Sequence, residues 1–389
     1  MAAAPATTEA PPDALAGKSL GERTWLLFRR DRRALFGLGC VGLLIILAVF
    51  APLLAENKPI VLATDGGLRF PLFATLTGED WRFLFYGIGS TLIVLLRHKW
   101  SGRTGLGLVL GLVLVTEVFC ANWQRFNDIT DYRELRAEGT WMLLPPVPYS
   151  PYETSAADYA APSPTHWLGT DGLGRDLLSR IIHGARPSLL IGFFAQGICL
   201  LIGCTLGAVA GFYRGWVDLA VSRVIETFEC FPTFFFIITI IAFVPRPELW
   251  HIMLVIGITS WPGLARLVRG EFLKLRARSF TQAALAAGAN DIRVMLKHIF
   301  PNTLGPVLVA TAFGVAAAIL VEASLAFLGF GVPPPYPTWG SALSEARVAI
   351  DFAWWLATFP GLAIFVTITA YNLLGEALRD AIDPTSERP

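Results

Sequence analysis

The sequence predicts an all-α integral membrane protein, organised as a polytopic helical bundle. Of its 389 residues, 54% are hydrophobic and only 16% are charged, which excludes an ordinary soluble domain. The apolar residues gather in runs of membrane length, and a helix needs about 20 such residues to cross a bilayer. Arginines and lysines gather between the runs, as they do in the cytoplasmic loops of membrane proteins.

The chain begins with a segment that is expected to stay in the cytoplasm. Residues 1–33 are predicted to form an N-terminal tail, disordered at its start, where Ala, Pro and Thr dominate. Residues 34–55 form an unbroken apolar run, which predicts the first transmembrane helix. Four arginines precede it, and by the positive-inside rule they hold the N-terminus in the cytoplasm. They are Arg29, Arg30, Arg32 and Arg33.

The next part of the chain predicts an external segment and a return into the membrane. Residues 56–81 are polar and rich in turn formers, so we expect them outside. Two apolar runs within residues 82–123, separated by a short basic stretch, predict an inserted transmembrane hairpin. Glu117 in this hairpin is an intramembrane acid, which either has a function or reaches water at the nearby outer end.

Residues 124–186 are expected to form a second external segment, in which prolines interrupt regular structure. The end of this segment is amphipathic. An apolar face is formed by Leu177, Leu178, Ile181 and Ile182. Arg175, Asp176 and Arg180 are expected to stay in water. This pattern is typical of a separate helix that lies at the outer membrane interface.

Five further apolar spans complete the predicted bundle within residues 187–374. They lie near residues 187–212, 228–244, 249–267, 303–328 and 355–374. With the first span they make a core of six helices, and the hairpin raises the total to eight. Residues 375–389 are expected to form a cytoplasmic C-terminal tail.

Small residues and prolines indicate how these spans pack. Gly203, Gly207 and Gly211 recur every four residues, so they form a strip where another helix can approach closely. Pro232 and Pro262 lie inside or at the ends of spans, where proline kinks helices.

Residues 271–300 form a polar, helix-forming stretch between two apolar spans. Gly288 is expected to end a first helix, and Asn290 or Asp291 to cap a second, which stops near Pro301. A basic helix–turn–helix in water suits a groove on another protein, although anionic lipid headgroups attract its charge equally well.

This stretch resembles the cytoplasmic EAA loop of permease subunits from bacterial ABC importers. The resemblance implies that it is the coupling loop, which contacts a separate ATPase subunit. The residues that carry it are Gln282, Ala283, Ala284, Gly288, Asn290, Asp291 and Pro301. One position departs from the family pattern, which has Glu where this chain has Gln282, so any salt bridge made by that Glu is not carried over.

A second stretch, residues 166–189, resembles the signature of the dipeptide and oligopeptide branch of these permeases. The resemblance implies that it shapes the outer interface. Its matching residues are Gly169, Thr170, Asp171, Gly174, Arg175 and Asp176. Residues 56–59 and 69–71 are similar to permeases of the microcin C and oligopeptide uptake type. The hairpin at 82–123 has no counterpart in the family pattern and is the main departure from it.

The resemblance implies a six-helix ABC importer permease core plus the inserted hairpin, in the bacterial inner (cytoplasmic) membrane with both termini inside. The implied function is a translocation pathway for peptides or peptide-like solutes, driven by ATP. The implied partners are two ATPase subunits, a second permease subunit that is a different chain, an external solute-binding protein and membrane lipid, with no nucleic acid.

The sequence contains no motif that predicts a nucleotide-binding, catalytic or metal site on this chain. Gly17-Lys18-Ser19 resembles the end of a P-loop, but Pro12 stands where the first glycine belongs. We therefore expect no catalytic residue, and ATP and Mg on the partner subunits. The five cysteines form no C-x-x-C pair, which favours buried free thiols over a metal site.

Glu322, inside the span 303–328, is costly in a membrane unless it faces a cavity or a partner. It either lines the transport pathway or makes a structural hydrogen bond between helices. Two rival functions stay open at this point. They are an integral-membrane enzyme that uses Glu117 or Glu322 as an acid or base, and an ion-coupled transporter.

Overall fold

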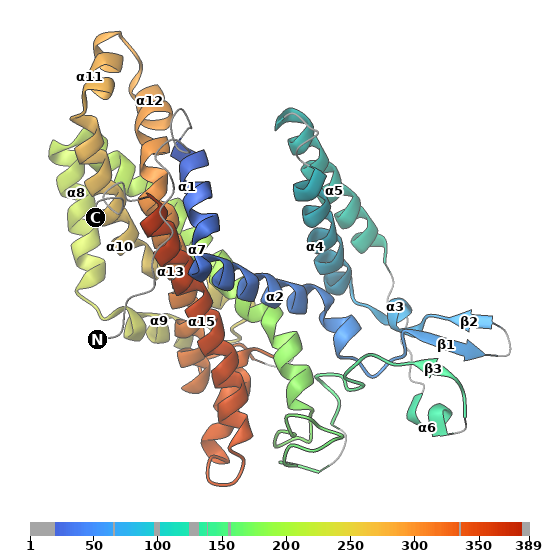
Figure 1. The fold of residues 1–389 in the computed structure, drawn as a ribbon. Helices are drawn as coiled ribbons and strands as arrows, with labels where there is room; N and C mark the ends of the chain where they lie inside the picture. The colour runs from blue at the N-terminus through green and yellow to red at the C-terminus, as the bar shows by residue number, and fades with distance from the viewer. Residues whose placement is uncertain are drawn as a thin grey trace, which may run out of the picture.

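The computed structural model describes residues 20–64, 67–96, 102–123, 132–137, 139–154, 157–333 and 336–382. Figure 1 shows a bundle of long helices with a separate helical hairpin beside it. Five helices of the described chain are long and apolar enough to cross a membrane, and a bent pair makes a sixth. The predicted all-α polytopic bundle is therefore confirmed. The spans are α2 (Arg32–Leu54), α7 (Leu177–Tyr213), α10 (Leu249–Arg276), Asp291–Phe327, which ends in α13 (Phe300–Phe327), and α15 (Trp355–Ile382).

Helix α7 lies at the centre of the bundle. It packs along α10 and also contacts α2 and α13, while α15 packs on α13 and α2. Buried hydrophobic clusters fill these contacts. One joins α2, α7, α13 and α15, and a second joins α7, α10 and α13 toward the end of α7 near Phe212. The core therefore depends on helix-to-helix packing of apolar faces.

The glycine strip on α7 allows the close helix approach that its spacing predicted, and the structure shows that the approaching helix is α10. A Cβ atom added at Gly207 would lie 2.5 Å from the carbonyl oxygen of Ala265 and 2.8 Å from the Cβ atom of Val268. Because these approaches are too close for a real side chain, the missing side chain of Gly207 sets the distance between the two helices.

Replacing Gly207 by Val is expected to force α7 and α10 apart and to lower the melting temperature of the purified protein in detergent. Overpacking of this kind costs about 1–3 kcal/mol. Gly197→Val is the matched control, because a Cβ atom at Gly197 on the same helix meets nothing within 4 Å. Equal melting temperatures for the two variants would contradict the role given to Gly207.

Helix α7 corrects one prediction. The separate interfacial helix expected at the end of residues 124–186 is the first part of α7, which continues through Pro187 to Tyr213. Ala185 and Leu189 lie on either side of Pro187 and belong to the same buried cluster. Packing on both sides of the proline therefore holds the helix together where the proline removes a backbone hydrogen bond.

The predicted kink at Pro232 is confirmed. Helices α8 (Gly215–Glu229) and α9 (Thr233–Ala242) meet there at an angle of 76°. The stretch between the predicted spans 187–212 and 228–244 is helical in α8. By contrast, α10 continues through Pro262 without a break. Of the thiols that were expected to be buried, Cys120 and Cys199 are buried, Cys40 and Cys204 are half-buried, and Cys230 at the bend is exposed.

The two predicted external segments pair with each other in a small antiparallel sheet. Its strands are β1 (Val61–Thr64), β2 (Gly67–Arg69) and β3 (Met142–Leu143), in the order β2-β1-β3. Short helices α3 (Pro71–Thr75) and α6 (Tyr132–Ala137) flank the strands in sequence. The all-α prediction missed this sheet because strands of two to four residues are too short to show a period-2 pattern.

The hairpin consists of α4 (Gly78–Leu96) and α5 (Gly102–Asn122), which pack on each other beside the bundle (Figure 1). Glu117 accepts hydrogen bonds from Arg82 at 3.2 Å and from the Tyr86 hydroxyl at 2.8 Å. It therefore pairs across the hairpin. Arg186 of α7 forms an ion pair with Asp80 and attaches the base of the hairpin to the core. The transmembrane position of this hairpin stays a prediction.

Both chain ends carry more helix than expected. Helix α1 (Leu20–Arg30) lies in the predicted N-terminal tail and packs on α15 and α2, with Trp25 stacked on Phe28. At the other end, α15 continues to Ile382 into the predicted C-terminal tail. The disorder predicted for residues 1–17 lies outside the described residues.

Candidate functional site

The predicted coupling loop forms a helical hairpin at one end of the bundle (Figure 1). Helix α10 is followed there by α11 (Ser279–Ala286) and α12 (Asp291–Val294). Gly288, between them, has a φ of +77°, a left-handed conformation that favours glycine. The Asn290 side chain caps α12 by accepting a hydrogen bond from the backbone N–H of Ile292 at 3.1 Å. The turn therefore has the geometry that the sequence predicted.

The second helix does not stop near Pro301, which corrects the prediction. A π-helical turn at Met295–Ile299 joins α12 to α13. Pro301 then lies in the first turn of α13, where a residue without an N–H group is tolerated. The wider π turn before it accommodates the proline within one continuous span of residues 291–327.

The hairpin presents small, polar and some large apolar side chains to solvent. Its exposed residues include Gln282, Ala283, Ala286, Ala287, Asn290, Asp291 and Ile292. Ala284 was expected on this face but packs instead against the buried cluster that contains Phe272 and Val294. Ala283 and Ala287, four residues apart, therefore define the flat surface available to a partner.

Gln282, which stands where the family pattern has Glu, forms a hydrogen bond within the chain. Its Nε2 donates a hydrogen bond to the carbonyl oxygen of Arg276 at 2.8 Å, at the end of α10. An ionised Glu at this position has no donor and cannot make this bond. Thr281, which is buried, donates to the carbonyl of Leu275 at 2.9 Å. These two bonds attach α11 firmly to α10.

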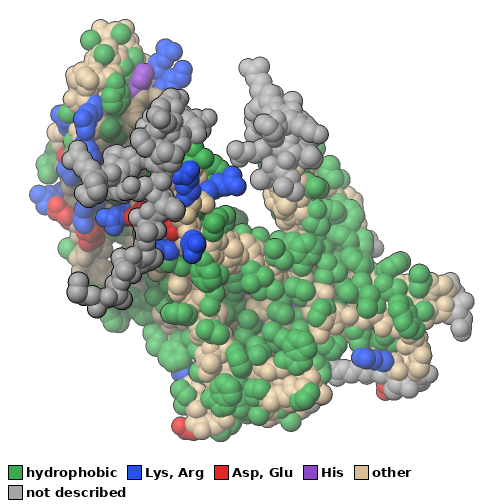
Figure 2. All heavy atoms as spheres, viewed as in Figure 1, with side chains coloured by type: hydrophobic (Ala, Val, Ile, Leu, Met, Phe, Trp, Pro, Cys, Tyr) green, Lys and Arg blue, Asp and Glu red, His purple; other side chains and the backbone are tan. Residues whose placement is uncertain are grey.

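Basic side chains connect the hairpin end of α10 to α8. Arg269 forms an ion pair with Asp218, and Arg266 forms one with Glu229. Figure 2 shows many Lys and Arg side chains gathered at this end of the bundle, while hydrophobic side chains cover much of the rest. The hairpin thus lies next to a region of α8 and α10 that is rich in basic side chains.

The predicted outer-face residues lie at the other end of α7 and form an ion network. Asp171 is fully buried and accepts hydrogen bonds from Arg175 Nε at 2.7 Å and from Arg180 Nη1 at 2.5 Å. Both arginines also reach Glu345, at 2.9 and 2.7 Å. Glu345 ends α14 (Trp339–Glu345) and was not predicted from the sequence.

This network corrects the expectation that Arg175, Asp176 and Arg180 stay in water, because Asp176 and Arg180 are buried and the Arg175 side chain is mostly covered. The Asp176 carboxylate caps α7 by accepting from the backbone N–H of Ser179 at 2.8 Å, and it pairs with His166 Nδ1 at 2.9 Å. The chain before α7 folds over the start of the helix, so the polar face meets protein.

Gly169 and Gly174 adopt left-handed conformations, with φ values of +81° and +70°. They shape the loop in which Thr170 accepts a hydrogen bond from the Trp355 indole at 3.0 Å through its carbonyl oxygen. The six predicted outer-face residues therefore lie in one structural unit at the start of α7.

Glu322 lies inside the chain, between α13 and α14. It is buried, and a Cβ atom added at Gly340 would lie 3.1 Å from its Oε2. Its Oε1 has no hydrogen-bond partner among the described residues. The carboxylate thus lies against α14, and both a pathway role and a structural hydrogen bond for Glu322 stay predictions.

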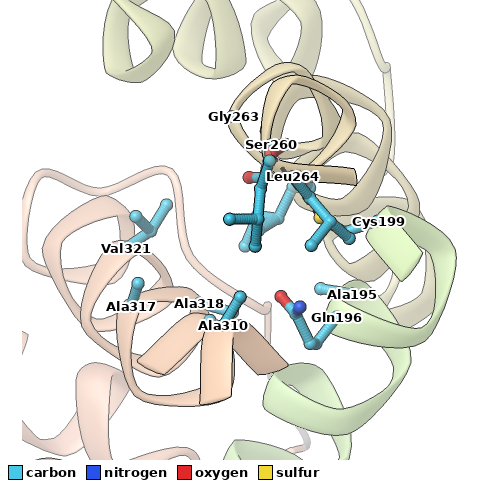
Figure 3. A pocket seen from close by; sticks show the side chains of 13 residues that line it. Ala195, Gln196, Cys199, Ser260, Gly263, Leu264, Ala310, Ala317, Ala318 and Val321 are labelled. Carbon is cyan, nitrogen blue, oxygen red and sulfur yellow. Dashed lines mark hydrogen bonds between the residues drawn. The ribbon is translucent and has the colours of Figure 1, made fainter. Parts of the chain in front are cut away.

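A cavity of about 230 Å³ lies between α7, α10 and α13. Figure 3 shows the Gln196 amide projecting into it, opposite Ser260 and small residues such as Ala317. Gly314 contacts the Gln196 side chain, so a larger residue there would displace the amide. Sequence reasoning missed Gln196, although a single amide inside a long apolar run was a visible signal.

Comparisons with known proteins agree with these features. A family described as the binding-protein-dependent transport system inner membrane component matches residues 203–388. A second family, described as the N-terminal TM domain of oligopeptide transport permease C, matches residues 19–67. The two matched ranges lie on either side of the hairpin.

The matches with individual relatives span most of the length of those proteins. A dipeptide transport system permease protein of Alkalihalophilus pseudofirmus is 42% identical over 223 residues, which is 57% of this chain and 73% of that protein. A glutathione transport system permease protein of Pectobacterium atrosepticum is 42% identical over 223 residues, 57% of this chain and 74% of its own. A solved structure of a methionine ABC transporter in inward facing conformations aligns with 52% of this chain and 96% of its own, at 16% identity and a TM-score of 0.45.

Proposed function

The chain belongs to the family of binding-protein-dependent transport system inner membrane components, and from this membership we propose that it forms part of the pathway by which peptides or peptide-like solutes enter the cell. It is a multi-pass permease subunit of an ABC importer and not an enzyme. The two rival functions, an integral-membrane enzyme and an ion-coupled transporter, are therefore set aside.

Peptides are the proposed substrate class. Relatives with 42% identity are named for dipeptide and for glutathione transport, and both solutes are short peptides. The matched N-terminal family is described as part of an oligopeptide permease. Both the names of the relatives and the sequence signature at residues 166–189 therefore support the same class.

The proposed assembly contains two ATPase subunits, a second permease subunit of different sequence and an external solute-binding protein. ATP and Mg would bind the ATPase subunits, and lipid would cover the exposed apolar side chains of the spans. The basic end with α11 and α12, together with both chain termini, would face the cytoplasm of the bacterial inner membrane, in keeping with the positive-inside rule.

The observation that carries this proposal is the hairpin of α11 and α12, with its exposed face of Ala283 and Ala287 beyond the end of α10. Closure of the ATPase subunits would move this hairpin. The hydrogen bonds from Thr281 and Gln282 connect it to α10, and the glycine strip holds α10 against α7. Movement of these helices would change the cavity that contains Gln196.

Purification of a tagged chain from native membranes, followed by mass spectrometry, tests the proposed assembly. We expect an ATPase with Walker motifs and a second permease to co-purify under mild extraction with crosslinking. The purified complex should hydrolyse ATP faster when both the binding protein and a peptide are present. Repeated recovery of the chain without any ATPase would contradict the proposal.

A further inference from the structure

We propose that Arg175 and Arg180 form a carboxylate-binding subsite at the outer end of the permease, which takes the C-terminal carboxylate of the transported peptide and which Glu345 occupies in this structure. The choice of ligand depends on the proposed peptide substrate. The subsite borders a cavity of about 670 Å³ between the start of α7, the link before α10, the end of α13 and α14.

The arginines are arranged around a single carboxylate position. Glu345 Oε1 accepts from Arg175 Nη2 at 2.9 Å, and its Oε2 accepts from Arg180 Nη1 at 2.7 Å. Asp171 holds both guanidinium groups from the protein side. Guanidinium groups match the planar geometry of carboxylates, and two of them on one carboxylate make a strong and directional site.

The members of the network differ in burial, and Glu345 is the one that a ligand could replace. The side chains of Asp171 and Arg180 are 0% and 3% exposed, whereas the Glu345 side chain is 29% exposed. Glu345 is also the last residue of a short helix, before a 3₁₀ turn at Ala346–Val348. It can therefore leave its position at the mouth without breaking the buried pairs behind it.

Charge and unused hydrogen-bonding capacity favour an anionic ligand. Two arginines with Asp171 carry a net charge of +1, which one carboxylate neutralises. Arg180 Nε is buried and has no hydrogen-bond partner among the described residues. Since an unpaired buried donor is costly, a ligand that supplies an acceptor here would be stabilised.

The cavity beside the arginines suits a short peptide. Its size lies within the range of about 300–1,000 Å³ that is usual for small-ligand sites. Its walls carry apolar and aromatic groups that include Tyr159, Tyr336, Pro247, Pro333 and Pro337. These surfaces can pack on peptide backbone and side chains, while the arginines fix the end that carries the charge.

Binding to the purified chain in lipid nanodiscs tests the subsite. The probes are tri-alanine and tri-alanine amide, which differ in the terminal carboxylate. Glu345→Gln removes the competing charge and keeps the side-chain shape, so it should tighten tri-alanine binding at least about tenfold, since 1.4 kcal/mol corresponds to that factor. Binding of the amide should not change. Asp351→Asn, an exposed acid near Glu345 in sequence, is the matched control and should behave as wild type.

A second variant removes one of the two arginines of the subsite. Arg175→Gln, added to Glu345→Gln, should abolish the tighter binding of tri-alanine, and the melting temperature of the double variant reports whether it is folded. If the double variant does not fold, the comparison of the two probes on Glu345→Gln decides alone.

Equal effects of Glu345→Gln on both probes would overturn the subsite. Tighter docking of the solute-binding protein without any preference for tri-alanine would also overturn it, since the carboxylate would then belong to that protein. Neither result affects the proposed assembly, because co-purification of the ATPase is measured separately.

Discussion

Replacing Ala283 by Glu is expected to lower ATP-driven uptake at least about 100-fold while the protein accumulates in the membrane at its normal level. Ala283 is exposed on α11, and Glu is a good helix former, so the hairpin should fold as before. In the proposed complex this face is covered by the ATPase. A carboxylate buried there without a partner costs several kcal/mol, and about 3 kcal/mol already exceeds a factor of 100 in affinity.

Uptake of a labelled peptide and recovery of the ATPase on the tagged chain should be measured together for this variant. Ala161→Glu provides the control, because Ala161 is also exposed but lies in the segment before α7, outside the hairpin and outside the membrane spans. We expect Ala161→Glu to retain both uptake and the ATPase. Normal uptake by Ala283→Glu would remove the hairpin face from the proposed coupling interface.

Asp171→Asn should destabilise the folded protein by about 3–5 kcal/mol, because it leaves Arg175 and Arg180 with one carboxylate fewer in a buried site. The amide group of Asn also cannot accept the backbone N–H bonds of Leu173 and Arg175 as strongly as a carboxylate does. We expect a clear fall in the melting temperature and in the yield of monodisperse protein in detergent.

Asp158→Asn is the comparison for this variant, since Asp158 lies in the same segment before α7 and is exposed. Its melting temperature should match that of the wild type. If Asp171→Asn melted at the wild-type temperature too, the network would contribute little to stability, and the arginines would have to be neutralised by Glu345 alone.

The spans and the coupling turn could be predicted because their signals are local. Apolar runs of membrane length specify helices, and Gly288 and Asn290 each carry the backbone preference that their position requires. The proline at 232 marked the bend between α8 and α9 for the same reason. Each of these features depends on a few neighbouring residues, which the sequence displays directly.

The buried ion network could not be predicted because its partners are far apart in the sequence. Arg180 pairs with Glu345, 165 residues away, and nothing near either residue indicates the other. Asp176 and Arg180 therefore looked like the wet face of an interfacial helix. Tertiary packing also decided that α7 continues through Pro187 and that Ala284 turns inward.

The length of α10 has a mechanical consequence. A helix of 28 residues at 1.5 Å per residue is about 42 Å long, and α10 reaches from the coupling hairpin to Pro247 beside the outer cavity. A tilt of roughly 10° about its hairpin end would displace the other end by about 7 Å, twice the width of a peptide backbone step. Small rotations at the hairpin end are thus magnified with distance. In the proposed orientation, a stiff helix of this length lets an event on the cytoplasmic side of the membrane resize a cavity on the outer side.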